Sequence, residues 1–169
     1  MARDSIIQED DPVLRVVAKP VPKKNIGSPA LSKIIKKMHA ALAPEKYGVA
    51  IAAPQVGESL RMFMVAGRVF KENEKDEAEP MPANRVYINP EITRASRIKR
   101  DEQEGCLSVR NMYGTVERHQ KVTLKALNEK GQVVVENASG LLCHIFQHEV
   151  DHLNGILFVD KAKNLHESK

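Results

Sequence analysis

The residues most capable of chemistry form the pattern His148-Glu149-Val150-Asp151-His152. Residues four positions apart share one face of a helix, so both imidazoles can reach a single metal ion. Glu149 follows the first histidine, where it can exchange a proton with a water at the metal without binding the ion itself. Two surface histidines on a helix would give the same pattern, but the helical spacing of the surrounding apolar residues favours a metal site.

Two histidines leave a catalytic site incomplete, because such a metal usually takes three protein ligands and keeps one position for water. One class of metalloprotease continues the pattern to a third histidine, but that position here is Phe158, which cannot bind a metal. The third ligand is therefore expected upstream. Cys106, in the segment Gln103-Glu104-Gly105-Cys106-Leu107-Ser108, is the candidate, because a thiolate binds divalent transition metals well.

Two helices are expected. One spans 141–153, where apolar residues recur at helical spacing before Asn154-Gly155 ends the run. This helix would carry both histidines. The other lies near the N-terminus: Ser28 can cap it, Pro29 suits its first turn, and Pro44 ends it.

Between the helices the sequence predicts strands. The candidates are 60–66, 85–88, 91–96, 122–126 and 133–136, with a break at Asn89-Pro90 and a hairpin turn at 128–131. The predicted fold is α+β, with mixed or antiparallel strands packed around the C-terminal helix and a further N-terminal helix. A length of 169 residues predicts one domain over 1–169, with an exposed loop at 71–82 and a flexible tail at 161–169.

Composition restricts the compartment and the partners. Two cysteines are too few for the framework of a small secreted scaffold, and no apolar run reaches membrane-spanning length, which predicts a cytoplasmic protein. The net charge of +4 permits weak attraction to an acidic partner such as ribosomal RNA. It does not reach the basic clustering expected of a sequence-specific nucleic-acid binder.

Three motifs together resemble those of the peptide deformylases. They are Gly48-Val49-Ala50-Ile51-Ala52-Ala53-Pro54-Gln55, then Glu104-Gly105-Cys106-Leu107-Ser108, then Gln147-His148-Glu149-Val150-Asp151-His152. The resemblance runs through nearly the whole chain. Three motifs in one order are far more specific than any one of them.

The resemblance implies a role for each matched position. The metal ligands would be Cys106, His148 and His152, and the acid–base group would be Glu149. The donors to the developing oxyanion would be the side-chain amide of Gln55 and the backbone N–H of Leu107. The peptide substrate would contact Gly48, Val49, Ala50 and Gly105.

The family assignment would also fix the reaction. Its members remove the N-formyl group from the initiator methionine of new bacterial and organellar proteins, so the substrate would be an N-formyl-methionyl nascent peptide. It implies one divalent metal per chain, natively Fe²⁺, with Zn²⁺, Ni²⁺ or Co²⁺ able to occupy the site. A bacterial-type cytoplasmic enzyme is expected, and the sequence leaves an organellar origin open.

Several positions depart from the usual family pattern. Ala50 stands where a glycine is usual and should either narrow the cleft or shift the substrate preference. Arg110 replaces a common proline and should alter the rim. His144 could border the pocket for the methionine side chain, but a partly exposed polar residue without a role is the favoured expectation. Glu104 and Arg118 resemble a family pair that braces the cysteine loop, which predicts an ion pair that orients the ligands.

Two alternatives stay open on the sequence. A zinc endopeptidase would also use the H-E-x-x-H pattern, although Phe158 weighs against it. A ribosome-associated protein that has lost catalysis could retain the fold, although every catalytic position holds the expected residue type. An assay of formate release from a formyl-Met peptide, compared with cleavage of internal peptide bonds, distinguishes a deformylase from an endopeptidase. Ribosome binding by a Glu149→Ala variant tests the second alternative.

Overall fold

The structure, a computed structural model, describes residues 5–72 and 78–168. Two helices are α1 (Pro29–Leu42) and α2 (Gly140–Leu153). One antiparallel sheet has the order β1 (Ala50–Ala52), β2 (Met62–Val65), β3 (Arg85–Ala95), β6 (Lys121–Leu127), β7 (Val133–Ser139). The other has the order β4 (Lys99–Cys106), β5 (Val109–His119), β8 (Lys163–Glu167). The expected α+β class is confirmed.

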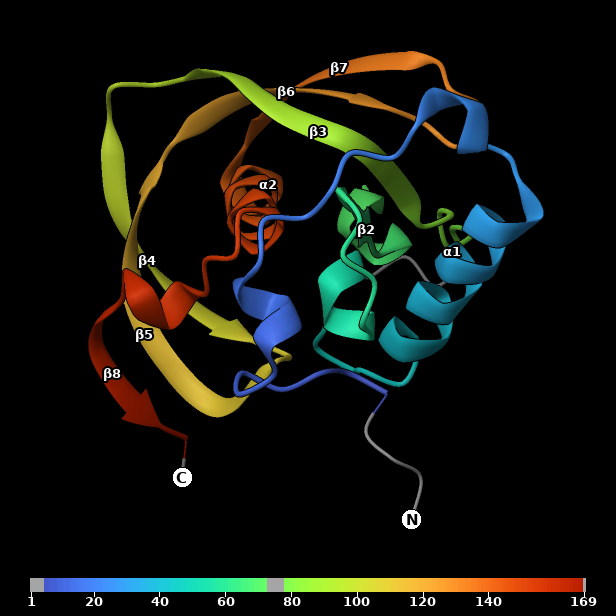
Figure 1. Ribbon diagram of the computed structural model, residues 1–169. Coiled ribbons are helices and arrows are strands. Elements are labelled where there is room, and N and C mark those ends of the chain that lie inside the picture. The colour runs from blue at the N-terminus through green and yellow to red at the C-terminus, as the bar shows by residue number, and fades with distance from the viewer. Residues whose placement is uncertain (1–4, 73–77, 169) are drawn as a thin grey trace.

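Helix α2 lies between the two sheets and contacts strands of both (Figure 1). Its inner face is anchored by Phe146, which is fully buried against Phe63 of β2 and Tyr87 of β3. The ring centroids of these three residues lie 5.0–6.0 Å apart, in the range of favourable aromatic contacts. The helix that carries the histidines is therefore fixed in the centre of the molecule.

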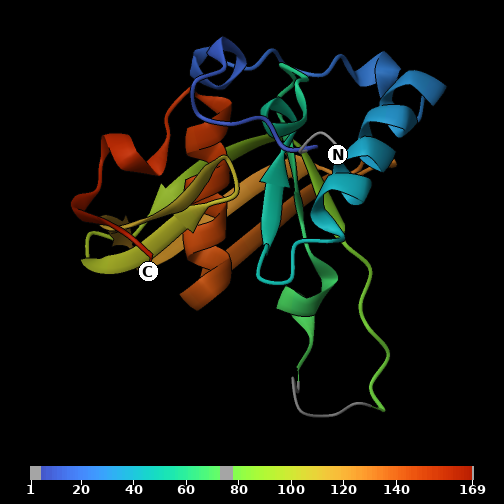
Figure 2. The same ribbon diagram turned by 90° about the horizontal axis from the view of Figure 1, so that it is seen from below.

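Helix α1 covers the other side of β2, which lies between the two helices in both views (Figures 1 and 2). As predicted, Ser28 caps this helix, accepting a hydrogen bond from the backbone N–H of Leu31 at 3.2 Å. The residues buried on its inner face recur at helical spacing: Leu31, Ile35, Met38, Ala41 and Leu42. The loop after α1 leads directly into β1.

The predicted break at Asn89-Pro90 is not a break between two strands. β3 is one strand over Arg85–Ala95, with a register irregularity between Ile88 and Glu91 where it pairs with β6. Asn89 has a left-handed φ of 51°, and its side chain bonds both the N–H and the C=O of Val21 at 2.8 and 2.9 Å. The irregularity thus holds the N-terminal segment against the sheet.

The predicted hairpin turn is present. Asn128 accepts, through its side chain, hydrogen bonds from the N–H groups of Lys130 and Gln132, and Gly131 has a φ of 75°. A second hairpin, β4–β5, was not predicted. Its β4 side chains are largely exposed and polar, so the apolar alternation that marks a strand is missing.

The structure differs from the prediction of a flexible tail over 161–169. Residues Lys163–Glu167 form β8, which pairs with β5 through Met112 and Tyr113. Every residue of β8 is exposed, so the strand buries no apolar face. Its sequence therefore lacks the apolar alternation by which a strand is predicted. Of the loop predicted at 71–82, positions 73–77 lie outside the described residues, as does 169, and the described part contains no helix or strand.

Candidate metal centre

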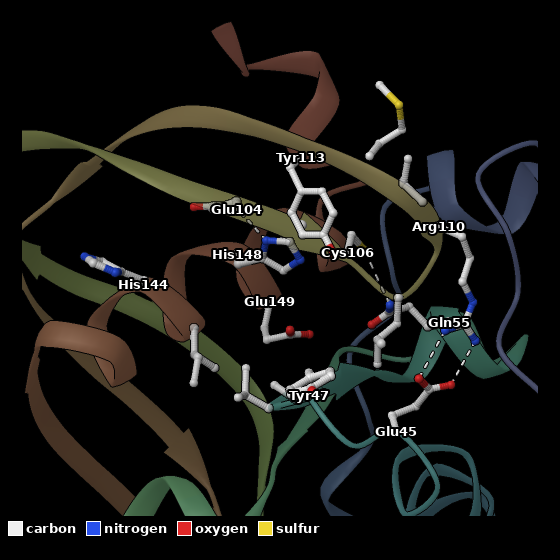
Figure 3. Close-up of a pocket in the computed structure, with 18 of the residues that line it drawn as sticks. Glu45, Tyr47, Gln55, Glu104, Cys106, Arg110, Tyr113, His144, His148 and Glu149 are labelled. Carbon is white, nitrogen blue, oxygen red and sulfur yellow. Dashed lines mark hydrogen bonds and ion pairs between the residues drawn. The ribbon is translucent and has the colours of Figure 1, made fainter. Parts of the chain in front are cut away.

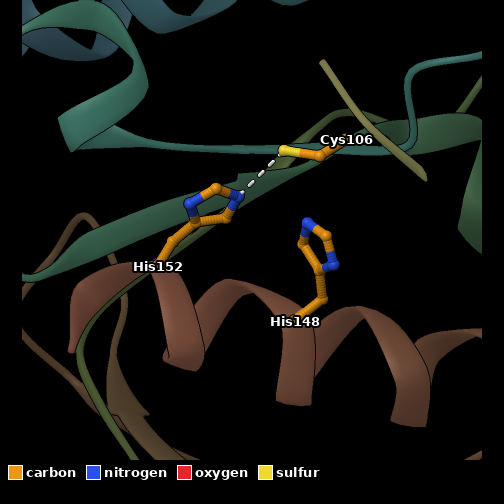
Figure 4. A group of neighbouring side chains, drawn as sticks. All are labelled: Cys106, His148 and His152. Atoms are coloured by element: carbon orange, nitrogen blue, oxygen red, sulfur yellow. Dashed lines mark hydrogen bonds between the residues drawn. The ribbon is translucent and has the colours of Figure 1, made fainter. Parts of the chain in front are cut away.

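The three predicted ligands lie close to one another (Figure 4). His148 and His152 project from one face of α2 toward Cys106, the last residue of β4. One ligand atom from each of the three residues lies within 4.8 Å of the others, and Cys106 Sγ is 3.3 Å from His152 Nε2. Two atoms bound to one ion at about 2.3 and 2.1 Å in tetrahedral geometry would be about 3.6 Å apart, so this spacing suits a shared metal.

His148 is oriented by a carboxylate. Its Nδ1 lies 2.9 Å from Glu104 Oε2. An ionised carboxylate can only accept, so Nδ1 carries the hydrogen and Nε2 is left with a lone pair for a metal. This carboxylate contact fixes both the tautomer and the direction of the ring.

Glu104 is in turn held by Arg118, as the sequence predicted. The guanidinium donates to both carboxylate oxygens, at 2.6 and 2.9 Å, and also to Asp151 at 2.7 Å. Only 3% of the Arg118 side chain is exposed. Burial alone would raise the pKa of Glu104, but the hydrogen bonds from Arg118 and His148 outweigh it and lower that pKa to about 2.

The electrostatics of the cluster favour a thiolate. Burial opposes ionisation of Cys106, but the neighbouring His152 and His148 lower its pKa well below the usual value. A thiolate and two imidazoles form a donor set suited to divalent transition metals. Among the described residues, no other group of histidine, cysteine and acidic side chains has this arrangement.

Glu149 faces the cleft beside the cluster (Figure 3). The residue is only 4% exposed, and burial raises the pKa of its carboxyl group. Its Oε2 is buried without a hydrogen-bond partner among the described residues. A buried oxygen in this position is suited to a water or substrate group at the metal, since buried polar atoms otherwise have partners.

Gln55 presents its amide nitrogen to the same site. The backbone N–H of Ala52 donates to Gln55 Oε1 at 2.8 Å, which identifies that atom as the oxygen. The nitrogen Nε2 then points toward Ser108 Oγ at 3.0 Å and Cys106 Sγ at 3.7 Å. Leu107 lies between Cys106 and Ser108, in the turn from β4 to β5.

The cluster opens into a cleft of about 630 Å³ (Figure 3). One wall is the loop from Pro44 to Ala50, the other is formed by Gln103–Leu107 and the first half of β5, and α2 supplies the base. The positions predicted to contact the peptide all line it: Gly48, Val49, Ala50 and Gly105. A volume of this size is typical of a small-ligand site.

Residues outside the three motifs also line the cleft. Tyr47, Tyr113 and Leu141 line its mouth, and the first of these is 85% exposed. His144 lines the cleft too, which agrees with the less favoured of its two expected placements, and its Nε2 lies 3.3 Å from Glu102 Oε1. The sequence contains one indication that these residues line the cleft, which is that they lie within a few positions of the three motifs. Cys143, on the same helix, is fully buried.

Comparison with known proteins agrees with this site. A sequence model described as polypeptide deformylase matches residues 4–168. The chain belongs to the polypeptide deformylase family. A peptide deformylase of Carboxydothermus hydrogenoformans is 42% identical over 165 residues, covering 98% of this chain and 97% of the relative. One from Mesorhizobium japonicum is 40% identical over 157 residues, covering 92% and 81%.

Solved deformylase structures share the fold. A class I type b peptide deformylase from Acinetobacter baumannii, bound to Met-Ala-Ser, has a TM-score of 0.79 and 38% identity, covering 92% of this chain and 96% of that one. The Thermotoga maritima enzyme has a TM-score of 0.78 and 35% identity, covering 94% and 96%. The family predicted from three motifs is confirmed, and with it the assignment as a deformylase enzyme, which disfavours the endopeptidase alternative.

Deformylases depend on a metal, and the cluster of Cys106, His148 and His152 is a possible site for one. Neither helix of the described chain is long and apolar enough to span a membrane. The family assignment thus agrees with the chemistry of the cleft, which combines a thiolate, two imidazoles and a buried carboxylate.

Proposed function

We propose that the enzyme removes the N-formyl group from the N-terminal formyl-methionine of newly synthesised polypeptides and releases formate. The observation that carries this proposal is the convergence of Cys106 with His148 and His152 beside the buried carboxylate of Glu149, at the base of a cleft. We assign the first three residues as metal ligands. A thiolate and two imidazoles suit Fe²⁺, Zn²⁺, Ni²⁺ and Co²⁺ alike, and we expect Fe²⁺ as the native ion from the family resemblance.

When bound, such a metal makes water a nucleophile near neutral pH and polarises the carbonyl that is attacked. Glu149 accepts the proton of the attacking water and later delivers it to the departing amine. Burial raises the pKa of Glu149 toward neutral pH, which suits both tasks, because the carboxylate can then accept a proton and the protonated form can donate it at the same pH. The products are formate and a free N-terminal methionine.

Charge develops on the formyl oxygen as its carbon becomes tetrahedral. We assign the Gln55 side-chain amide and the Leu107 backbone N–H as donors to this oxygen. In support, Gln55 Nε2 already lies within 3.7 Å of Cys106 Sγ, and its oxygen is held by Ala52. Because the Gln55 amide is held by the Ala52 N–H, this donor needs little reorganisation during the reaction.

The peptide is proposed to lie along the wall that contains Gly48, Val49 and Ala50, opposite Gly105. A Cβ on Gly48 would come within 3.1 Å of the Leu107 side chain, and one on Gly105 within 2.9 Å of the Tyr113 ring. Glycine at these two positions therefore permits a close approach of neighbouring side chains that a larger residue would displace. Contact with the ribosome, which the net charge of +4 permits, and a cytoplasmic location stay predictions.

The proposal is tested by anaerobic purification with metal analysis, together with an assay of formate release from formyl-Met-Ala-Ser. This peptide is chosen because the Acinetobacter baumannii relative binds Met-Ala-Ser. We expect one metal per chain, formate release by the wild type, and loss of release in Glu149→Ala with the metal retained. Wild-type protein that holds its metal and yields no formate would refute the proposal.

A further inference from the structure

An ion pair joins the two walls of the cleft at the side nearest Gln55 (Figure 3). Arg110, at the start of β5, donates from Nη1 and Nη2 to the two carboxylate oxygens of Glu45, at 3.1 and 2.8 Å. Glu45 belongs to the loop between α1 and β1. We call this pair, Glu45 with Arg110, the clasp. The expected change to the rim at Arg110 thus takes the form of a bridge between the walls.

The clasp holds the side chain of a residue whose backbone is joined to the start of the wall. The Glu45 carbonyl accepts a hydrogen bond from the Gly48 N–H at 3.0 Å and another from Arg68 Nη2 at 3.0 Å. A Cβ on Gly48 would lie 2.9 Å from the Glu45 Cβ, so these two residues are packed closely. The position of Glu45 therefore determines the position of the wall that begins at Gly48.

The exposed end of this wall depends on the clasp as well. Tyr47, two residues after Glu45, is 85% exposed at the mouth of the cleft and gains no support from burial. On the opposite side, Arg110 follows Ser108 and Val109, which continue the turn that contains the proposed oxyanion donor Leu107. One bidentate contact thus links the peptide-binding loop to the oxyanion turn.

We propose that the clasp is a positioning device that sets the width of the cleft and so determines affinity for the peptide following the formyl group. This inference rests on the proposed function. The clasp joins Arg110 to Glu45, and neither residue is a proposed metal ligand, acid–base group or oxyanion donor. Loss of the clasp should therefore weaken binding of the peptide more than it slows the chemical step.

The size of the effect follows from exposure. The side chains of Arg110 and Glu45 are 37% and 21% exposed, so the pair is screened only in part. Its two parallel hydrogen bonds make it stronger than an ordinary surface pair. We expect Glu45→Gln and Arg110→Met each to raise KM about threefold to tenfold for formyl-Met-Ala-Ser amide, an uncharged peptide, and to change kcat less than about twofold.

The matched control is Arg15→Met. Arg15 pairs with Asp160 at 2.6 Å, with similar exposures of 43% and 39%, and does not line the cleft. Its replacement should leave KM unchanged. The double variant Glu45→Arg/Arg110→Glu restores opposite charges at the two positions and should recover at least half of the lost affinity. Raising the ionic strength from about 0.05 to 0.5 M should raise KM of the wild type and leave that of Arg110→Met unaffected.

These outcomes separate the clasp from the proposed function. A wild-type enzyme without formate release refutes the function itself. An active wild type whose KM is unchanged by Glu45→Gln and Arg110→Met overturns the clasp, as does a rise in KM that Arg15→Met reproduces. Thermal unfolding of each variant, followed by circular dichroism, identifies any that fail to fold, and the charge-swapped variant then decides the matter alone.

Discussion

Gln55 reaches the cleft with its amide nitrogen because its oxygen is occupied by the N–H of Ala52 at 2.8 Å. A donor fixed in this way contributes mainly to the transition state, where charge is greatest. We expect Gln55→Ala to lower kcat about a hundredfold, with a much smaller change in KM. Steady-state formate release measures both. The metal content of the variant is the control, and wild-type kcat with full metal occupancy would remove Gln55 from the oxyanion site.

Arg118 acts on the metal through Glu104 and His148. Removing its guanidinium leaves Glu104 and Asp151 buried without their partner, and His148 loses its fixed orientation. We expect Arg118→Ala to weaken metal affinity about tenfold to a hundredfold. Arg118→Lys keeps the positive charge but loses the paired hydrogen bonds, so its metal affinity should lie between those of the wild type and Arg118→Ala.

Competition with a chelator measures this metal affinity directly. Arg15→Ala is a suitable comparison, because it removes an arginine whose side chain is 43% exposed and distant from the cluster. Arg118→Ala protein that holds its metal as firmly as the wild type would show that Arg118 has only a structural role.

At the scale of the elements, the periodicity of apolar residues predicted the two helices, each of which has a buried face. Both helices were located within one or two residues, because each buries a regular stripe against the sheets. The ligands on α2 followed from that helix, since spacing along a helix fixes which side chains share a face. The metal cluster was accessible to sequence reasoning for the same reason.

The two strands that the sequence did not predict, β4 and β8, are held in place by backbone pairing with β5. β4 and β8 expose most of their side chains, so their pairing leaves no apolar pattern to read. Cys106 could be named as a ligand, but the hairpin that positions it could not be predicted. The clasp was missed for a related reason, since a contact between residues 65 positions apart depends on the whole topology.

The end of α2 depends on a glycine. Gly155 has a φ of 73°, and a Cβ there would lie 2.6 Å from the backbone oxygen of Arg15. Gly155→Ala should lower the free energy of unfolding by about 2–4 kcal/mol, from backbone strain and the clash together. Gly27→Ala is the matched control: φ is 82° with open space around it, so only the strain of about 1 kcal/mol applies. Urea unfolding measures both, and equal losses would contradict the clash.

At the scale of the whole molecule, the buried Glu104 makes stability depend on pH. Its folded-state pKa is about 2, whereas the ordinary value is 4.5. Folding therefore favours the ionised form, and the benefit is complete above about pH 5 and is lost as the pH falls through 4.5 toward 2. A shift of this size corresponds to about 3 kcal/mol at neutral pH.

Glu104→Gln removes this ionisation and keeps the shape of the side chain. We expect the wild type to exceed the variant in free energy of unfolding by about 3 kcal/mol at pH 7, and the difference to shrink steadily below pH 4.5. Urea unfolding of metal-free protein measures it, so that release of the metal does not contribute. A difference that stays constant from pH 7 to pH 3 would mean that Arg118 and His148 do not stabilise the charge on Glu104, and the bracing of His148 would need another source.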